Sequence, residues 1–282
     1  MSLDKFYELI QSSQAELSEV LKDLDKFYYE KVELKIDRKT GLPKLKNGNP
    51  QFRRIRPSRG ALRRIQDALK NNILNKINMP EYVQGSVKGK SNITNAAKHF
   101  GNRYFFLTDL KNFFPSITHS AVYKTFCARG FLPEVSSLIA KLTTYKGTVP
   151  QGIPTSSSIA NIVFLPIDKK ILSLLPENII TYTRYVDDLT FSSKGDFKEL
   201  VQPILEMIEK NGFKYSNKKT NYKAKDPYIT GIKLEKKRMT VAGSLKSQIA
   251  DQNLPENRRK AIEDYISRVE RFWKNTPKPE IQ

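Results

Sequence analysis

Apolar positions along the chain change their spacing several times, and these changes divide it into expected helices and strands. Over residues 3–28 the apolar side chains recur with a helical period. The same period returns over residues 59–77, and Pro80 is expected to end that helix. Further helices are expected over residues 118–144, 155–174, 197–210 and 255–274.

Runs rich in β-branched and aromatic residues predict the strands. Residues 104–108 form such a run, and the strand is expected to deliver Asp109 to its end. Two more runs, residues 181–185 and 189–191, enclose the adjacent acids Asp187 and Asp188. The pattern therefore predicts a hairpin with the acidic pair at its tip. Other short segments are a positively charged hairpin or loop pair, expected over residues 35–58, and strands expected near 213–215 and 228–234.

Composition adds a partner class to this picture. The 282 residues suffice for one large or two ordinary domains with a real core, and no linker marks a boundary. The chain has 49 Lys and Arg against 29 Asp and Glu, a net charge of +20. Self-repulsion for solubility does not require the positive sign, so this excess favours a polyanionic partner such as nucleic acid.

Residue usage also argues against several classes of protein. Cys127 is the only cysteine, so no internal disulfide can form. With only two histidines besides, a structural zinc site is not expected. The acidic amino terminus lacks a long apolar segment, and no apolar run approaches the ~20 residues of a membrane span. We expect a cytoplasmic protein that does not enter a membrane.

The three acids named above suggest a chemistry. Adjacent carboxylates repel each other, and divalent cations offset that repulsion. Asp109 and Asp187 are 187 − 109 = 78 residues apart, on two separate expected strands. Carboxylates that converge from two strands suit a pair of Mg²⁺ ions about 3.5–4 Å apart and phosphoryl transfer. A solvated acidic turn is the alternative for an isolated pair.

Seven segments, taken in order, resemble the motifs of reverse transcriptases. LTDLKNFFPSI, VPQGIPTSSSIANI and RYVDDLTF are similar to motifs A, B and C. NGFKYSNKKT is similar to motif D, and YITGIKL to the segment that contacts the primer end. FRRIRPSRGALRRIQDAL resembles the fingers motif, and SNITNAAKHFG resembles the Asn-Ala-x-x-His box of retron enzymes. Val186 stands where retron enzymes more often carry alanine.

The resemblance implies an α+β right-hand polymerase fold with fingers, palm and thumb. Residues 1–108 would form an N-terminal helix and the fingers. Residues 109–235 would form the palm, an antiparallel sheet packed on helices, with a fingers insertion at about 118–148. Residues 236–282 would form a short helical thumb.

The same resemblance assigns catalytic roles. Two Mg²⁺ ions would be held by Asp109, Asp187 and Asp188, with help from the backbone of Leu110. Lys219 would act as the general acid toward the departing pyrophosphate. Its neighbour Lys218 is the alternative if the motif is displaced by one residue.

Five residues are implied in nucleotide binding: Arg54, Arg56, Phe114, Gln151 and Gly152. Phe114 would exclude a ribose 2′-hydroxyl, although core packing beside Phe113 is an alternative role. Gly152 could equally serve a plain turn. The two arginines would hold the triphosphate through their forked guanidinium groups, or they are merely solvated.

Six residues are implied in nucleic-acid binding: Asn95, His99, Thr230, Gly231, Arg271 and Trp273. Asn95 and His99 are four residues apart, so they could instead be a capping and packing pair of one helix. The terminal basic helix could ride along a nucleic-acid groove with a stacking contact from Trp273. Alternatively, its aromatic face docks on the core.

The function implied is an RNA-directed DNA polymerase of the retron type, in which a primer hydroxyl attacks the α-phosphate of a dNTP. Its partners would be a structured non-coding RNA as template and primer, the RNA–DNA hybrid product, and a toxin or effector protein in anti-phage defence. One alternative is a non-retron defence enzyme with untemplated, repetitive or protein-primed synthesis. Another is an inactive basic RNA-binding scaffold.

Overall fold

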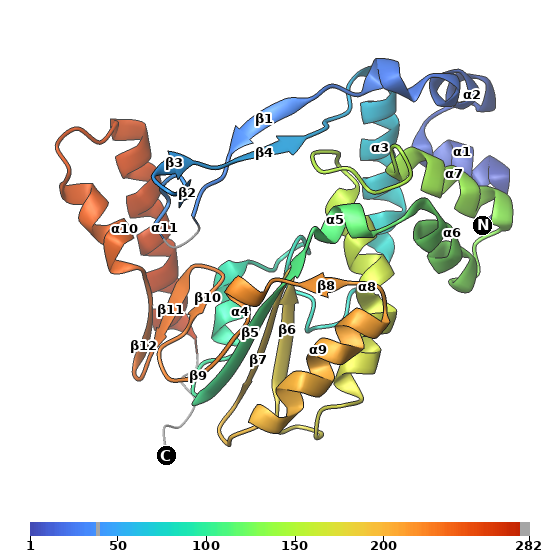
Figure 1. Cartoon of the computed structure of the whole chain (residues 1–282). Coiled ribbons are helices and arrows are strands. Elements are labelled where there is room, and N and C mark those ends of the chain that lie inside the picture. Colours follow the sequence, from blue (N-terminus) through green and yellow to red (C-terminus); the bar gives the residue numbers. More distant parts are fainter. Residues whose placement is uncertain (38–39, 277–282) are drawn as a thin grey trace.

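The structure is a computed structural model that describes residues 1–37 and 40–276. Its centre is an antiparallel sheet in which β6 (Thr181–Tyr185), β7 (Asp188–Ser193) and β5 (Tyr104–Lys111) lie side by side. The other edge of β5 pairs with two short strands, β8 (Lys214–Tyr215) and β9 (Asn221–Ala224). The expected acidic hairpin, β6–β7, therefore lies beside the strand that carries Asp109 (Figure 1).

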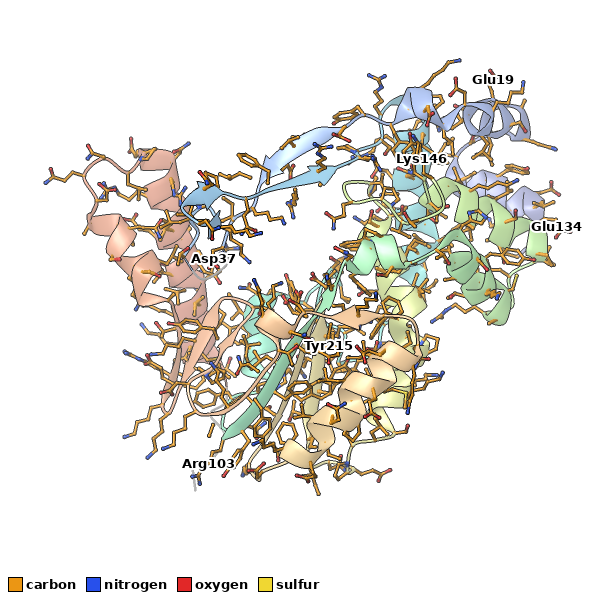
Figure 2. All side chains as sticks on the ribbon, in the orientation of Figure 1. Glu19, Asp37, Arg103, Glu134, Lys146 and Tyr215 are labelled. Carbon is orange, nitrogen blue, oxygen red and sulfur yellow. The ribbon has the colours of Figure 1, made fainter. Side chains whose placement is uncertain are left out.

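The two faces of the sheet differ because side chains alternate along each strand. One face contributes to the main hydrophobic core through Phe106, Leu110, Leu189 and Phe191. Two helices of that core, α8 (Ser156–Leu172) and α9 (Val201–Lys210), cover this face, and side chains fill the layer between sheet and helices (Figures 1 and 2). Phe105 and Leu107 belong to a second cluster. Asp109 continues their spacing, so it lies on the face opposite the helices.

Helices from the N-terminal half extend the main core: α1 (Leu3–Ile10), α2 (Gln14–Lys22), α3 (Gly60–Asn72), α6 (His119–Ala128) and α7 (Pro133–Thr143). The helical stretch expected over residues 3–28 is interrupted. Gln11 has a left-handed backbone with φ of 54°, and Ser13 starts a new helix by accepting a hydrogen bond from the amide of Glu16. A single turn of 3-10 helix, Leu24–Phe27, then follows.

Two other expected boundaries are wrong by a few residues. The helix expected over residues 59–77 ends at Asn72, whose side chain donates a 2.7 Å hydrogen bond to the carbonyl of Leu9 on α1. A separate 3-10 turn, Leu74–Lys76, follows it. Strand β5 continues to Lys111, so Asp109 lies within the strand rather than at its end. The other helices and the acidic hairpin are confirmed within a few residues, with residues 118–144 divided into α6 and α7.

The positively charged hairpin is a long two-stranded ribbon. In it β1 (Lys31–Leu34) pairs with β4 (Phe52–Ile55), and β2 (Leu45–Lys46) pairs with β3 (Asn49–Pro50). The ribbon reaches from α3 to the helices at the C-terminal end of the chain (Figure 1). There the side chain of Gln248 donates a hydrogen bond to the carbonyl of Thr40. The side chain of Arg258 donates a hydrogen bond to the carbonyl of Gly41.

A second, smaller core lies on the other side of the sheet. It is built by α4 (Asn92–Ala97), by the three-stranded sheet of β10 (Tyr228–Ile229), β11 (Ile232–Glu235) and β12 (Arg238–Val241), and by α10 (Gly243–Ser247) and α11 (Glu256–Asn275). The expected basic amphipathic helix is α11, which buries Ile262 and Val269. Across residues 1–37 and 40–276, no helix is both long enough and apolar enough to cross a membrane.

Candidate active site

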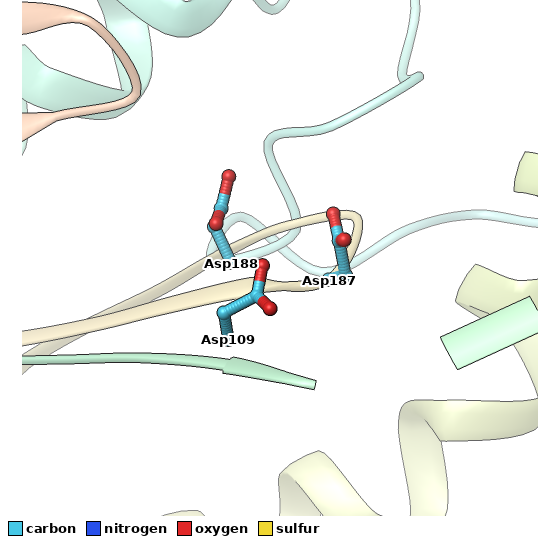
Figure 3. Close-up of side chains that lie close together, drawn as sticks. All are labelled: Asp109, Asp187 and Asp188. Atoms are coloured by element: carbon cyan, nitrogen blue, oxygen red, sulfur yellow. The ribbon is translucent and has the colours of Figure 1, made fainter. Parts of the chain in front are cut away.

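Three carboxylates converge where β5 meets the β6–β7 hairpin (Figure 3). Asp109 on β5 is directly opposite Asp188, the first residue of β7. Asp187 lies in the turn just before it. One oxygen of each carboxylate lies within 4.8 Å of the other two. The convergence expected from the sequence is therefore present in the fold.

Backbone contacts fix the turn that carries Asp187. The amide of Leu110 donates a 2.9 Å hydrogen bond to the carbonyl of Asp187, which ties the turn to β5. Val186 has a φ of 61°, in the left-handed region that β-branched residues rarely occupy. The turn is thus held in one conformation against a local preference.

The electrostatics of the site centre on Asp109 and Lys219. Burial raises the pKa of Asp109 to about 6, against the hydrogen bond from Lys219, which lowers it. Burial alone would lower the pKa of Lys219, but its hydrogen bond to Asp109 and the nearby acids raise it overall. The ammonium group of Lys219 therefore stays charged and partly offsets the repulsion among the acids.

The donor chemistry suits a hard divalent cation. Three carboxylates gather their oxygens in one place, which is the ligand type that Mg²⁺ prefers. The contact between Asp109 and the ammonium of Lys219 also shows that this position attracts a positive charge. The residues present therefore fit a magnesium site.

Phe114 lies near this site in the short helix α5 (Phe113–Ser116). Its ring centroid is 5.7 Å from that of Phe113. Phe113 is buried and packs against Phe164 and Phe213, whereas Phe114 is only partly buried. Phe113 therefore lies in the core, and Phe114 packs at the edge of the same core.

The loop at Gln151 and Gly152 contacts the base of the ribbon. The carbonyl of Gln151 accepts a 2.7 Å hydrogen bond from the amide of Arg56. Gly152 has a φ of 105°, and a Cβ there would lie 3.3 Å from the backbone nitrogen of Pro57. Glycine at this position therefore serves both a turn and a close approach. The guanidinium groups of Arg54 and Arg56 are exposed and lie 3.6 and 3.7 Å from Glu30.

His99 follows α4, and its side chain is buried against β6 and β7 of the central sheet. Its Nδ1 hydrogen-bonds the hydroxyl of Ser192 at 2.6 Å, and its Nε2 hydrogen-bonds that of Thr183 at 2.7 Å. These partners lie on β7 and β6, so the imidazole ties α4 to the acidic hairpin. Burial lowers the pKa of His99 to about 3.

This histidine predicts a pH dependence of stability. His99 stays neutral in the folded chain but titrates near pH 6.5 when unfolded, so its stabilising contribution is present above that pH. It is lost progressively as the pH falls, by about 2 kcal/mol between pH 6.5 and pH 5. Urea unfolding of the His99→Gln variant should show a flatter pH profile over this range. His119→Gln is the matched control and should keep the wild-type slope.

Asn95 and Thr230 are brought together although they are 135 residues apart. The side-chain amide of Asn95 donates a 3.3 Å hydrogen bond to the Thr230 hydroxyl, and that of Asn92 donates one of 3.1 Å to the Thr230 carbonyl. Thr230 and Gly231 form the turn between β10 and β11, with φ of 47° and 92°. The Asn-Ala-x-x-His box thus braces this turn as well as the acidic hairpin.

The structure shows how the aromatic side chains of the terminal helix pack. The ring of Trp273 lies 4.4 Å from that of Phe100, centroid to centroid, and Phe272 packs against the same cluster. The aromatic face of α11 is therefore docked on the second core. Arg271 is exposed on the same helix. Whether either residue contacts nucleic acid stays a prediction.

Sequence analysis did not single out the residues behind the acidic turn. Arg184 and Asp168 form a fully buried ion pair at 2.7 Å between β6 and α8. Asn161, two turns before Asp168 on the same face of α8, joins them. Two features of the sequence could have pointed to these residues. One is an arginine within an otherwise buried strand, and the other is a pair of polar residues seven positions apart on an apolar helix.

Comparison with known proteins places this geometry in a family. Residues 43–241 match the family described as reverse transcriptase (RNA-dependent DNA polymerase). The chain is also similar to a solved structure, the telomerase of Candida albicans in complex with a fragment of telomeric RNA. That match has a TM-score of 0.52 and 11% identity, and it covers 76% of this chain and 46% of that one. At this identity the likeness shows the fold alone.

Curated relatives are similar over the same region. Retron Ec86 reverse transcriptase of Escherichia coli is 34% identical over 167 residues, which cover 58% of this chain and 52% of that protein. Retron Se72 reverse transcriptase of Salmonella heidelberg is 35% identical over 149 residues, 52% of this chain and 39% of that protein. Retron Mx65 reverse transcriptase of Myxococcus xanthus is 30% identical over 195 residues, 61% and 45% of the two chains. The chain spans about half the length of the curated relatives it matches.

Proposed function

This chain belongs to the reverse transcriptase family, and from that premise we propose that it is a retron-type RNA-directed DNA polymerase. The observation that carries the proposal is the convergence of Asp109, Asp187 and Asp188 from two adjacent strands. The similarity to three retron reverse transcriptases supports the subtype. The net charge of +20 suits a template and product that are both polyanions.

We propose that the chain is organised as fingers, palm and a short thumb. Residues 1–108 would supply the N-terminal helix and fingers, and residues 109–235 the palm. The palm would hold β6 to β9 and the end of β5, because this boundary falls inside β5 (Tyr104–Lys111). The insertion at about 118–148 contains α6 and α7, and α7 packs with α1 and α3 of the N-terminal part, which supports its place in the fingers. Residues 236–282 would be the thumb, of which 277–282 lie outside the described residues.

In the proposed reaction, the primer hydroxyl attacks the α-phosphate of a dNTP and pyrophosphate departs. Two Mg²⁺ ions bound by the acids, with help from the Leu110 backbone, would lower the pKa of that hydroxyl and offset the charge on the departing phosphates. Asp109 would orient the metal site from β5, while Asp187 and Asp188 would complete it from the hairpin. Lys219, whose ammonium already lies against Asp109, would donate the proton that pyrophosphate takes up.

Other residues would position the substrates. Arg54 and Arg56 would bind the triphosphate, and the loop at Gln151 and Gly152 would support the incoming nucleotide. Both arginines are exposed, and the backbone amide of Arg56 donates a hydrogen bond to the carbonyl of Gln151, which supports a shared role for the two segments. Six residues would serve the binding of the primer, template or structured RNA: Asn95, His99, Thr230, Gly231, Arg271 and Trp273. The side chains of Asn95 and His99 are completely buried, so these two would act by holding the Thr230 turn and the acidic hairpin in place.

Phe114 is proposed to exclude ribonucleotides. Phe114→Ala removes this partly buried ring, so the variant should accept NTPs. Its discrimination between dNTPs and NTPs should fall by a factor on the order of 10–100. Steady-state incorporation of dGTP against GTP measures the ratio. Phe113→Leu is the matched control, since its side chain is buried in the core and its loss should lower stability without changing the ratio. Unchanged discrimination in Phe114→Ala would contradict the gate.

We further propose that the enzyme acts in the cytoplasm, on a structured non-coding RNA that serves as template and primer, with a toxin or effector protein in anti-phage defence. Primer extension with purified protein, a panel of RNAs that includes the transcript encoded beside its gene, Mg²⁺ and dNTPs tests the activity. Product sequencing separates templated synthesis from untemplated or repetitive synthesis. Salt-dependent RNA binding without Mg²⁺-dependent incorporation would instead identify a basic RNA-binding scaffold.

A further inference from the structure

The acidic turn rests on a buried polar network whose residues have none of the roles assigned above. Val186 precedes the two acids and adopts a left-handed backbone, which costs a β-branched residue conformational energy. Such a conformation persists only where the surroundings determine it strongly. The contacts behind the turn therefore indicate what holds Asp187 and Asp188 in place.

Arg184 supplies the first of these contacts. Its side chain is completely buried between β6 and α8, and a guanidinium has five N–H donors to satisfy. Nε and Nη2 bind the carboxylate of Asp168 at 2.7 to 3.1 Å, and Nη2 also reaches the Asn161 carbonyl at 3.3 Å. Nη1 donates to the side-chain oxygen of Asn161 at 2.7 Å and to the carbonyl of Val186 at 3.3 Å. Every donor is used, and one of them holds the acidic turn.

Asn161 supplies the second contact. Its side-chain amide donates a 2.8 Å hydrogen bond to the carbonyl of Gly85, and Gly85 lies directly on the turn. A Cβ at Gly85 would fall 2.4 Å from the backbone nitrogen of Val186. The same segment pairs with β6, because the amide of Gln84 donates to the carbonyl of Arg184 at 2.8 Å. The turn is thus enclosed by Arg184 on one side and by Gly85 on the other.

We propose that Arg184, Asp168 and Asn161 are positioning residues, which hold the Val186 turn so that the acids bind divalent cations in one fixed geometry. The inference deepens the proposed function, on which it rests. A buried ion pair is weak evidence for a role in stability, because apolar residues of similar volume often do as well. Groups behind a metal site that orient its ligands commonly change metal affinity by about 10–100-fold.

Three variants of the full-length chain separate positioning from folding. Arg184→Lys keeps the charge but lacks the planar fork that joins Asp168, Asn161 and Val186. Asn161→Ser leaves the ion pair in place and removes both side-chain bonds of Asn161. Tyr182→Phe is the matched control, because it removes a 2.7 Å hydrogen bond to the same Asp168 without touching the turn. Circular dichroism and thermal unfolding establish which variants are folded.

The primary readout is binding of Mn²⁺, followed by electron paramagnetic resonance of the free ion in the absence of substrate. Arg184→Lys should weaken Mn²⁺ binding by about tenfold or more, Asn161→Ser should weaken it several-fold, and Tyr182→Phe should change it by less than about twofold. The Mg²⁺ concentration for half-maximal primer extension should rise in the same order. RNA affinity without metal should be unchanged.

The outcomes are distinct. Wild-type Mn²⁺ affinity in folded Arg184→Lys or Asn161→Ser would overturn the inference while leaving the proposed function untouched. Failure of both variants to fold would also overturn it, since the network would then serve the fold as a whole. If the wild-type chain binds no Mn²⁺ that depends on Asp187 and Asp188, the proposed function itself is contradicted.

Discussion

DNA synthesis should fall by a factor on the order of 10³ or more when Asp187 and Asp188 are both replaced by asparagine. That factor corresponds to about 4 kcal/mol of transition-state stabilisation. Asparagine keeps the shape of each side chain, but it removes two of the three carboxylates whose oxygens converge within 4.8 Å. The remaining acid, Asp109, could not hold the divalent cations alone.

Single-turnover primer extension at saturating RNA measures this loss. The variant should remain folded, because two mutually repelling charges disappear from one turn and the backbone bond from Leu110 to residue 187 is kept. Glu209→Gln, on the exposed part of α9, is the control for removal of a surface acid and should retain full activity. Synthesis at the wild-type rate by the double variant would show that the three acids are not the catalytic centre.

Gly85→Ala should produce the next largest effect, on stability and on activity together. The added Cβ would lie 2.4 Å from the nitrogen of Val186 and 2.8 Å from the carbonyl carbon of Tyr185. Both are backbone atoms, so no side-chain rotation relieves the overlap and the acidic turn must move. Overpacking of this kind typically lowers the free energy of unfolding by about 1–3 kcal/mol. A shift of about 1 Å in the catalytic acids costs on the order of 100-fold in rate.

Gly195→Ala is the matched control for this substitution. A Cβ there meets nothing within 4 Å, and its φ is not in the left-handed region. It should leave activity unchanged and stability within about 1 kcal/mol of wild type. Chemical denaturation and primer extension on the two variants give the comparison. Equal stability and equal activity of Gly85→Ala and Gly195→Ala would mean that Gly85 does not constrain the turn.

The structure explains why some site residues were predictable and others were not. Asp109 and the Asp187–Asp188 pair follow from local patterns, since each is attached to a strand that its own neighbours specify. Lys219 was assigned by resemblance, and the fold places its ammonium against Asp109. The helix expected over residues 3–28 failed at Gln11, because the spacing of apolar residues does not show where a serine will cap a new helix.

Arg184 has contacts that local patterns do not predict. Its partners Asp168 and Asn161 are 16 and 23 residues away, on a helix whose face toward β6 is set by packing. A fully buried charge is tolerated only where a partner is already in place, so its role cannot be inferred from its own neighbours. The hydrogen bond between Asn95 and Thr230 joins residues 135 positions apart, so it too could not be inferred from neighbouring residues.

By itself, the sequence determined the secondary structure around the acids, the positive charge that suits a polyanion, and the resemblance that names the chemistry. These depend on side-chain periodicity, on composition and on residues adjacent in the chain. Only the tertiary structure decided that Trp273 packs on Phe100, that His99 bridges two strands, and that Arg184 supports the acidic turn. The contacts of Trp273 and His99 join segments far apart in sequence, and Arg184 reaches the turn only because Asp168 and Asn161, 16 and 23 residues away, hold its side chain. Buried polar groups are stable only where such partners satisfy them.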